Sequence, residues 1–425
     1  MRGKRRFLEG VKTLLIILLS ASALYLLTMT PLVKDSWLED LLKGEQVTKS
    51  DPLSVTLTAA ARPSRIAVSD GVNRYGIQYN QSAVDELFVR MGPLLGEALV
   101  SSGAPEKITE KQWRQYLREK SIYFDFTGEI PLSALSGWLQ SEQSCGLSAS
   151  ARRILLVGGG EDSVLLCYQD AADQKFYACP TGLLWELHLE PEVSGINGNG
   201  AQFAFEDAEW MDLLHPYTLM TEDSVQRIFN VSVPLTNGAV RTELLEALDY
   251  AGRNHASVSG GELYLDGNDR LHVMMNGRVS YDAAQGGKYA VASVGTTATV
   301  AESIEAARRL AERTIGAQCG AAELYLVSAE ETQQGLRIRF GYRLDGSTVW
   351  LYDGGWAAEF YVNGGYITNF TLHFRHYAVT DEEELLLPME RAAVILPGLN
   401  STERELILQY RDQGESEVKP GWVAR

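Results

Sequence analysis

The feature that most constrains this chain is an uncharged, largely apolar run of 21 residues at positions 13–33. An α-helix rises 1.5 Å per residue, so about 20 residues cross the hydrocarbon core of a bilayer. A cleavable leader usually carries a shorter apolar segment that ends in small residues. Ala21-Ser22-Ala23 resembles such an ending, but the apolar residues 24–27 follow it directly. We therefore predict an uncleaved transmembrane anchor.

Charge on either side of this run sets its orientation. Residues 1–12 carry five basic groups and one acid, a net charge of +4. Basic residues stay on the cytoplasmic side of a membrane helix, so we expect residues 35–425 to face outward. Because the whole chain carries −17, everything after residue 12 carries −21. A body this acidic repels polyphosphate, which argues against nucleic-acid binding.

The anchor contains a patch of small residues, Ser20, Ala21, Ser22 and Ala23. Small side chains let two membrane helices approach closely, so this patch is a candidate contact with a partner helix. The alternative is that these residues are merely small and face lipid.

The length of 425 residues predicts two or three domains outside the membrane. In the first of them, Thr109 is a candidate N-cap of an amphipathic helix, and residues 151–182 show three strands joined by tight turns. We predict an α+β protein divided into a cytoplasmic tail at 1–12, an anchor at 13–33, a stalk at 34–61, an N-terminal domain at 62–221, a middle domain at 222–298 and a C-terminal domain at 299–425.

A weak internal repeat suggests the last two domains. Each unit has a helix, then GGELYL or AAELYL, then an alternating strand, and then an N-G or D-G turn with another strand. The second helix is well specified, because Thr299 and Glu302 have the spacing of a capping box. Two such units predict two similar domains, each with a helix on an antiparallel sheet.

The sequence contains none of the common catalytic or phosphate-binding motifs G-x-S-x-G, H-E-x-x-H and G-x-x-x-x-G-K-[ST]. His373 and His376 are three apart on a predicted strand and so point to opposite faces. Asp266 and Asp269 are in a turn-like stretch, where aspartate is expected anyway. The acid run 381–384 precedes a predicted helix, whose positive end favours carboxylates. We therefore predict no catalytic, cofactor-binding or metal-binding residues.

Four cysteines, Cys145, Cys167, Cys179 and Cys319, show no C-x-x-C pair. Cys167 and Cys179 flank a predicted hairpin turn, so a cross-strand disulfide between them is one interpretation. Two buried free thiols are the other, and we favour the free thiols.

Several segments resemble the YycH/YycI family of membrane-anchored regulators. They are the basic tail with its single anchor, SIYFDFTGEIPLSALSGWL, LYLDGNDRLHVMMNGRVSYD and YRLDGSTVWLYDGGWAAEFYVNGGYITNFTLHFRHY. These are loose patterns of strand and turn residues, and the length of the chain is closer to YycH than to the shorter YycI. In that family an N-terminal outer domain precedes two mutually similar domains, which agrees with the repeat.

The resemblance implies a non-enzymatic regulator, without cofactors, of a WalK-type sensor histidine kinase that controls the cell envelope. Its implied partners are the kinase, a YycI-like sister protein and the membrane. Two other functions stay open from the residues: a binding module for a component of the cell envelope, and a cell-wall enzyme whose site the sequence does not reveal.

Overall fold

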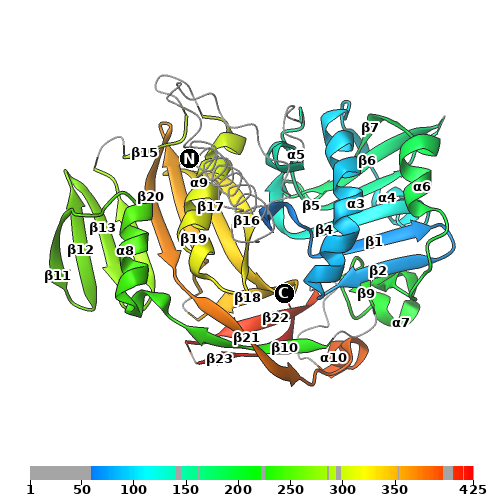
Figure 1. The fold of residues 1–425 in the computed structure, drawn as a ribbon. Helices are drawn as coiled ribbons and strands as arrows, with labels where there is room; N and C mark the ends of the chain where they lie inside the picture. The colour runs from blue at the N-terminus through cyan, green and yellow to red at the C-terminus, as the bar shows by residue number, and fades with distance from the viewer. Residues whose placement is uncertain are drawn as a thin grey trace, which may run out of the picture. The chain divides into compact units, whose positions relative to one another are not determined.

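A computed structural model describes residues 59–139, 145–160, 162–221, 225–284, 287–292, 298–352, 354–395, 405–414 and 416–424. The predicted tail, the anchor and nearly all of the stalk lie outside these residues. Within the described ranges, no helix combines the length and the apolar character that crossing a membrane requires. Residues Val55–Arg425 form one compact unit, and all that follows concerns this unit. It is an α+β structure with large antiparallel sheets, as predicted for the outer part (Figure 1).

The first sheet has seven antiparallel strands in the order β2-β1-β4-β5-β6-β7-β3. Its strands are β1 (Arg65–Asp70), β2 (Arg74–Gln78), β3 (Glu106–Ile108), β4 (Lys120–Pro131), β5 (Ser150–Gly158), β6 (Ser163–Asp170) and β7 (Phe176–Leu184). Its helices are α3 (Gln81–Val100), α4 (Glu110–Tyr116), α5 (Leu132–Leu139), the π-helix η2 (Trp185–Leu189), α6 (Glu190–Val193) and α7 (Ala208–Met211). The small pair β8 (Gln202–Phe203) and β9 (Leu219–Met220) stands on either side of α7 in the chain.

Local signals account for much of this part. The predicted cap Thr109 accepts a hydrogen bond from the Gln112 backbone N–H, and the Gln112 side chain accepts one from the Thr109 N–H in return. This capping box starts α4 where the sequence predicts it. The three strands predicted over 151–182 are β5, β6 and β7, so that prediction is confirmed. Apolar side chains pack on both faces of the sheet, which explains why β4 and β5 are almost continuously buried instead of alternating.

The second sheet has twelve strands, in the order β11-β12-β13-β14-β20-β19-β17-β18-β22-β24, with β15 added on β20 and β16 added on β17. All of its pairs are antiparallel except β18 with β22. Its strands are β11 (Asn254–Val258), β12 (Gly261–Asp266), β13 (Asp269–Met274), β14 (Arg278–Asp282), β15 (Tyr289–Ala290), β16 (Glu323–Thr332), β17 (Gly335–Leu344), β18 (Ser347–Leu351), β19 (Ala358–Asn363), β20 (Tyr366–His373), β22 (Leu406–Asp412) and β24 (Pro420–Ala424).

The two predicted repeat units are both present as helix and strands. The first has α8 (Gly238–Ala247) with β11 to β14, and the second has α9 (Val300–Arg313) with β16 to β20. The capping box of α9 forms as predicted, since Thr299 accepts a bond from the Glu302 N–H and Glu302 returns one. Pairing of β14 with β20 joins the units into one continuous sheet (Figure 1). That the two units superpose stays a prediction.

A third sheet corrects one prediction. Strand β10 (Gln226–Ser232) lies between β21 (His376–Glu384) and β23 (Glu417–Val418). The acid run 381–384 therefore belongs to β21 and not to the beginning of a helix, and α10 (Met389–Ile395) starts five residues later. The reason is a distant partner strand, because β10 pairs Gln226 with Glu384 and Arg227 with Glu383.

One apolar core connects the first and second sheets. The same cluster of buried side chains contains Phe88 and Phe124 from the first sheet and its helix, and Phe340 and Phe360 from the second sheet. A shared core of this kind explains why residues Val55–Arg425 form one compact unit.

Candidate functional site

The structure separates the residues that the sequence singles out. The patch Ser20, Ala21, Ser22 and Ala23 lies outside the described residues, so its role stays a prediction. Cys167 and Cys179 are buried, free thiols. The pairing of β6 with β7 places Cys167 opposite Ala178, one position away from Cys179. Neighbouring strand positions point to opposite faces, so the two thiols enter different cores and the disulfide is not formed.

The other polar candidates have local structural roles. His373 and His376 each bond through Nδ1 to a backbone carbonyl, of Trp356 at 2.7 Å and of Gln318 at 2.9 Å. Asp266 pairs with Lys288 at 2.8 Å. The turn predicted there is confirmed, since β12 and β13 form a hairpin across it. Among the described residues, no three His, Cys, Asp or Glu side chains are arranged to hold a metal ion.

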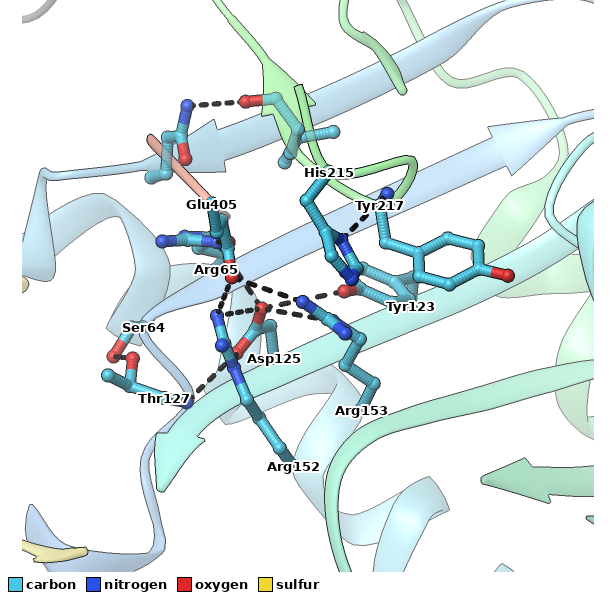
Figure 2. Close-up of polar contacts among 12 residues, drawn as sticks. Ser64, Arg65, Tyr123, Asp125, Thr127, Arg152, Arg153, His215, Tyr217 and Glu405 are labelled. Carbon is cyan, nitrogen blue, oxygen red and sulfur yellow. Dashed lines mark hydrogen bonds and ion pairs between the residues drawn. The ribbon is translucent and has the colours of Figure 1, made fainter. Parts of the chain in front are cut away.

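The strongest polar feature is one that the sequence analysis did not identify. Three arginines surround two carboxylates where the first sheet meets the start of β22 (Figure 2). We call this group the arginine–carboxylate cluster; its members are Arg65 of β1, Asp125 of β4, Arg152 and Arg153 of β5, and Glu405 before β22. Asp125 is 0% exposed and Glu405 is 4% exposed.

The contacts of the cluster are close and shared. Arg152 reaches both carboxylates, with Nε 2.8 Å from Asp125 and Nη2 2.8 Å from Glu405. Arg65 also contacts both, at 3.3 Å from Asp125 and at shorter range from Glu405. Arg153 donates to Glu405 at 3.1 Å. Each carboxylate is thus held by several guanidinium groups, which is the geometry that makes a buried ion pair tolerable.

Strand pairing brings these side chains together. In the antiparallel register Arg65 lies opposite Asp125, and Asp125 lies opposite Arg153. Consecutive residues on a regular strand point to opposite faces, yet Arg152 and Arg153 both reach the cluster. An irregularity in the pairing of β5 with β6 spans these two arginines. Such a bulge redirects a side chain and accounts for the shared direction of the two guanidinium groups.

Charge in the cluster is fixed by its neighbours. Burial alone would raise the pKa of Asp125 and Glu405, but the adjacent guanidinium groups, Arg152 first, lower the pKa of both carboxyls below its ordinary value. Burial, with Arg153 nearby, lowers the pKa of His215 to about 4. At neutral pH the site therefore holds three cations, two anions and a neutral imidazole. Carboxylates held ionised in this way are poor proton donors, which favours a structural role over acid catalysis.

A second set of ion pairs lies nearby, between the segment that enters β1, helix α3 and the second sheet. Arg62 contacts Asp85 of α3 at 2.8 Å and Glu323 of β16 at 2.9 Å. Arg343 of β17 is 3.0 Å from Glu323 and donates to the backbone carbonyl of Arg62 at 3.1 Å. These contacts join the segment before β1 and helix α3 to the second sheet, and the cluster joins the first sheet to the start of β22.

A cavity of about 390 Å³ opens beside the cluster. Its walls include Arg152, His215 and Glu405 from the cluster side, and Arg339 and Trp356 from the second sheet. Arg339 already pairs with Glu359 at 2.7 Å and lies over the Trp356 ring. The walls are thus occupied by ion pairs that the protein makes with itself.

Two signals in the sequence could have revealed the cluster. Arg152-Arg153 directly precedes the apolar run ILLV, and Asp125 interrupts the apolar stretch SIYFDF. Charged residues inside otherwise buried strands must find partners, because an isolated buried charge is very costly. The partners themselves could not have been named, since Glu405 is 340 positions from Arg65.

Comparison with known proteins gives one informative result. No protein-family profile matches the chain, and no curated protein has a significantly similar sequence. The fold is similar to the crystal structure of YycH from Bacillus subtilis, with a TM-score of 0.50 and 12% sequence identity. The match covers 90% of this chain and 96% of that chain. This likeness shows a YycH-like fold across nearly the whole length of both proteins.

Proposed function

We propose that this protein is a membrane-anchored, extracytoplasmic, non-enzymatic regulator of a two-component sensor histidine kinase that controls the cell envelope. The observation that supports the proposal most is the YycH-like fold over 90% of the chain. It agrees with the family resemblance of the sequence, which rests on different features: the basic tail, the anchor and the strand and turn phrases of the outer part.

The proposed path of regulation follows from a physical limit. A single membrane helix forms no channel, so a signal that it carries must pass through the helix itself. Information therefore crosses the bilayer through contact, tilt or displacement of helices. Partners, which we propose to be the kinase and a YycI-like sister protein, contact the anchor, the outer part or both.

The arginine–carboxylate cluster has a place in this proposal. It ties β1, β4 and β5 to the beginning of β22, so the first sheet and the end of the chain move together. A displacement imposed at the end of the chain is then passed to β1, the first strand of the outer unit. The ionised state of the cluster keeps this connection intact at neutral pH.

Affinity purification from membranes tests the proposal. The full chain, tagged at its C-terminus and solubilised in mild detergent, is expected to retain the sensor kinase. Replacing Ala21 and Ala23 with Leu should weaken retention by about 1 kcal/mol if Ser20–Ala23 is a packing face, because larger side chains hold the helices apart. Replacing Leu18 and Leu19 with Ile is the matched control. Absence of the kinase, together with hydrolysis of wall polymer by the purified chain, would favour the enzyme alternative instead.

A further inference from the structure

We propose that an aromatic pocket on the second sheet binds an acidic glycan, meaning a chain of pyranose sugars that carry carboxylate groups. The pocket has a volume of about 620 Å³ and lies over β18, β22 and β24. This volume is within the range of small-molecule sites, roughly 300–1,000 Å³. Its principal side chains are Trp350, Tyr352, Trp356, Gln409, Arg411 and Gln413.

The parallel pairing of β18 with β22 builds the floor of the pocket. Thr348 lies beside Gln409, and Trp350 lies beside Arg411, so these four side chains share one face of the sheet. Gln409 donates to the Thr348 hydroxyl at 3.2 Å, which holds the amide in place. On the neighbouring strand β24, Gly421 lies opposite Gln409, and a Cβ there would meet no atom within 4 Å. The floor is thus open above the glycine.

The other face of the same strands is already covered. Tyr410 packs its ring edge-on against Phe229 of β10, with 5.5 Å between the ring centres. Tyr410 also donates to the backbone carbonyl of Arg227 at 2.9 Å. The aromatic pocket therefore lies on the face that β10 leaves uncovered.

Aromatic rings are the main apolar surface of the pocket. Trp350 is 49% exposed and Tyr352 is 74% exposed. Among the described residues that line the pocket, these two are the large apolar side chains exposed to solvent. The face of an aromatic ring carries partial negative charge and attracts the weakly positive C–H groups on the face of a pyranose. Two exposed rings beside amide side chains suit a ligand with flat apolar faces and polar edges, as a sugar has.

The polar groups select for a negative charge on that sugar. Arg411 is exposed and makes no ion pair with any residue that the structure describes. No acidic side chain is among the described residues that line the pocket. Gln409 and Gln413 offer both donors and acceptors to hydroxyl and acetamide groups. Although the chain carries a net charge of −17, this pocket presents an arginine between aromatic rings and amides. That arginine is well placed to bind a carboxylate.

A protein partner is the less suitable occupant. Stable protein interfaces bury about 800 Å² on each side around a continuous apolar centre. Here the exposed apolar groups are two separate aromatic rings beside a concave floor. The glycan assignment rests on the proposed extracytoplasmic location, which places the pocket beside polymers of this chemical class.

Binding of defined sugars to the full chain in detergent micelles tests the assignment. The probes are N-acetylglucosaminyl-N-acetylmuramic acid, which carries a carboxylate, and the neutral disaccharide chitobiose. Saturation-transfer NMR and titration of tryptophan fluorescence should both report binding, with the acidic sugar preferred. Trp350→Ala should weaken the binding of both sugars by about tenfold, the effect of losing a central aromatic contact. Arg411→Gln should abolish the preference, while Arg90→Gln, an exposed arginine elsewhere, should preserve it.

Absence of saturation transfer from the acidic disaccharide would overturn the assignment. Equal binding by the wild type and Trp350→Ala would do the same, because it would place any sugar elsewhere. If Trp350→Ala preparations lose the kinase and the wild type binds no sugar, the pocket is a protein contact. That result would also overturn the glycan assignment. Because the sugar titration contains no kinase, its failure leaves kinase regulation standing, and failure of kinase regulation leaves a measured sugar affinity standing.

Discussion

Gly128 of β4 lies directly against the backbone of Leu326 in β16, so that a Cβ at position 128 would be 2.0 Å from the Leu326 carbonyl oxygen. Real Cβ atoms do not approach an oxygen this closely. The absence of a side chain at residue 128 is therefore what allows the first and second sheets to touch here. The preceding residue, Thr127, has a positive φ of 66° and marks the irregular stretch of β4 that carries Gly128 to this contact.

Gly128→Ala is expected to destabilise the protein by about 1–3 kcal/mol, the range for overpacked sites. The neighbour that must move is backbone, which cannot rotate away as a side chain can. Gly137→Ala is the matched control, because a Cβ at that position in α5 meets nothing within 4 Å. The control should be neutral or slightly stabilising, since alanine is the better helix former. Urea unfolding followed by circular dichroism measures both; equal midpoints would refute the close contact.

Glu405→Gln tests the arginine–carboxylate cluster. The substitution leaves three guanidinium groups facing Asp125 alone, and breaking a buried charge network typically costs about 3–5 kcal/mol. Glu330→Gln removes a more exposed carboxylate that pairs with Arg337 at 2.6 Å, and should cost about 0–1 kcal/mol. The free energy of unfolding from denaturant titration distinguishes them. A loss for Glu405→Gln no larger than that for Glu330→Gln would show that the cluster does not hold the structure together.

The sequence predicted the elements whose determinants are local. The capping boxes at Thr109 and Thr299 each lie within four residues, and both helices start where expected. The acid run 381–384 was misplaced because its partner, β10, is about 150 residues away in the chain. The arginine–carboxylate cluster was not predicted for the same reason, since strand pairing and not sequence proximity brings Glu405 to Arg65. Local patterns specify helices and turns; long-range pairing specifies the site.

The lowered pKa of His215 predicts how the free energy of unfolding depends on pH. Its pKa is lowered from 6.5 to about 4 in the folded protein, so between these values the unfolded chain binds more protons. Stability must then fall as the pH decreases from 6.5 towards 4, with a contribution of at most about 1.4 kcal/mol per pH unit. His215→Gln should flatten this part of the profile. Above pH 6.5 the difference between variant and wild type should be constant; an unchanged slope below it would contradict the assignment.

The free cysteines predict a labelling pattern. Burial raises the pKa of Cys179 to about 11 and raises that of Cys167 still further, so few reactive thiolates form in the folded protein. Iodoacetamide should modify neither thiol before unfolding. In concentrated guanidinium without reductant, all four cysteines of the chain should be alkylated in the intact mass. Two unmodified cysteines that become reactive only after reduction would show a disulfide.

The most direct measurement of the central claim is the phosphorylated fraction of the response regulator that the kinase controls, separated on phosphate-affinity gels from cells with and without this protein. We predict a several-fold change on deletion that the full chain reverses. In the proposed function the anchor carries the signal across the membrane, so residues 35–425 released outside the cell should not reverse the change. An unchanged phosphorylated fraction in the deletion strain, under envelope stress as well as in normal growth, would contradict the proposed regulation.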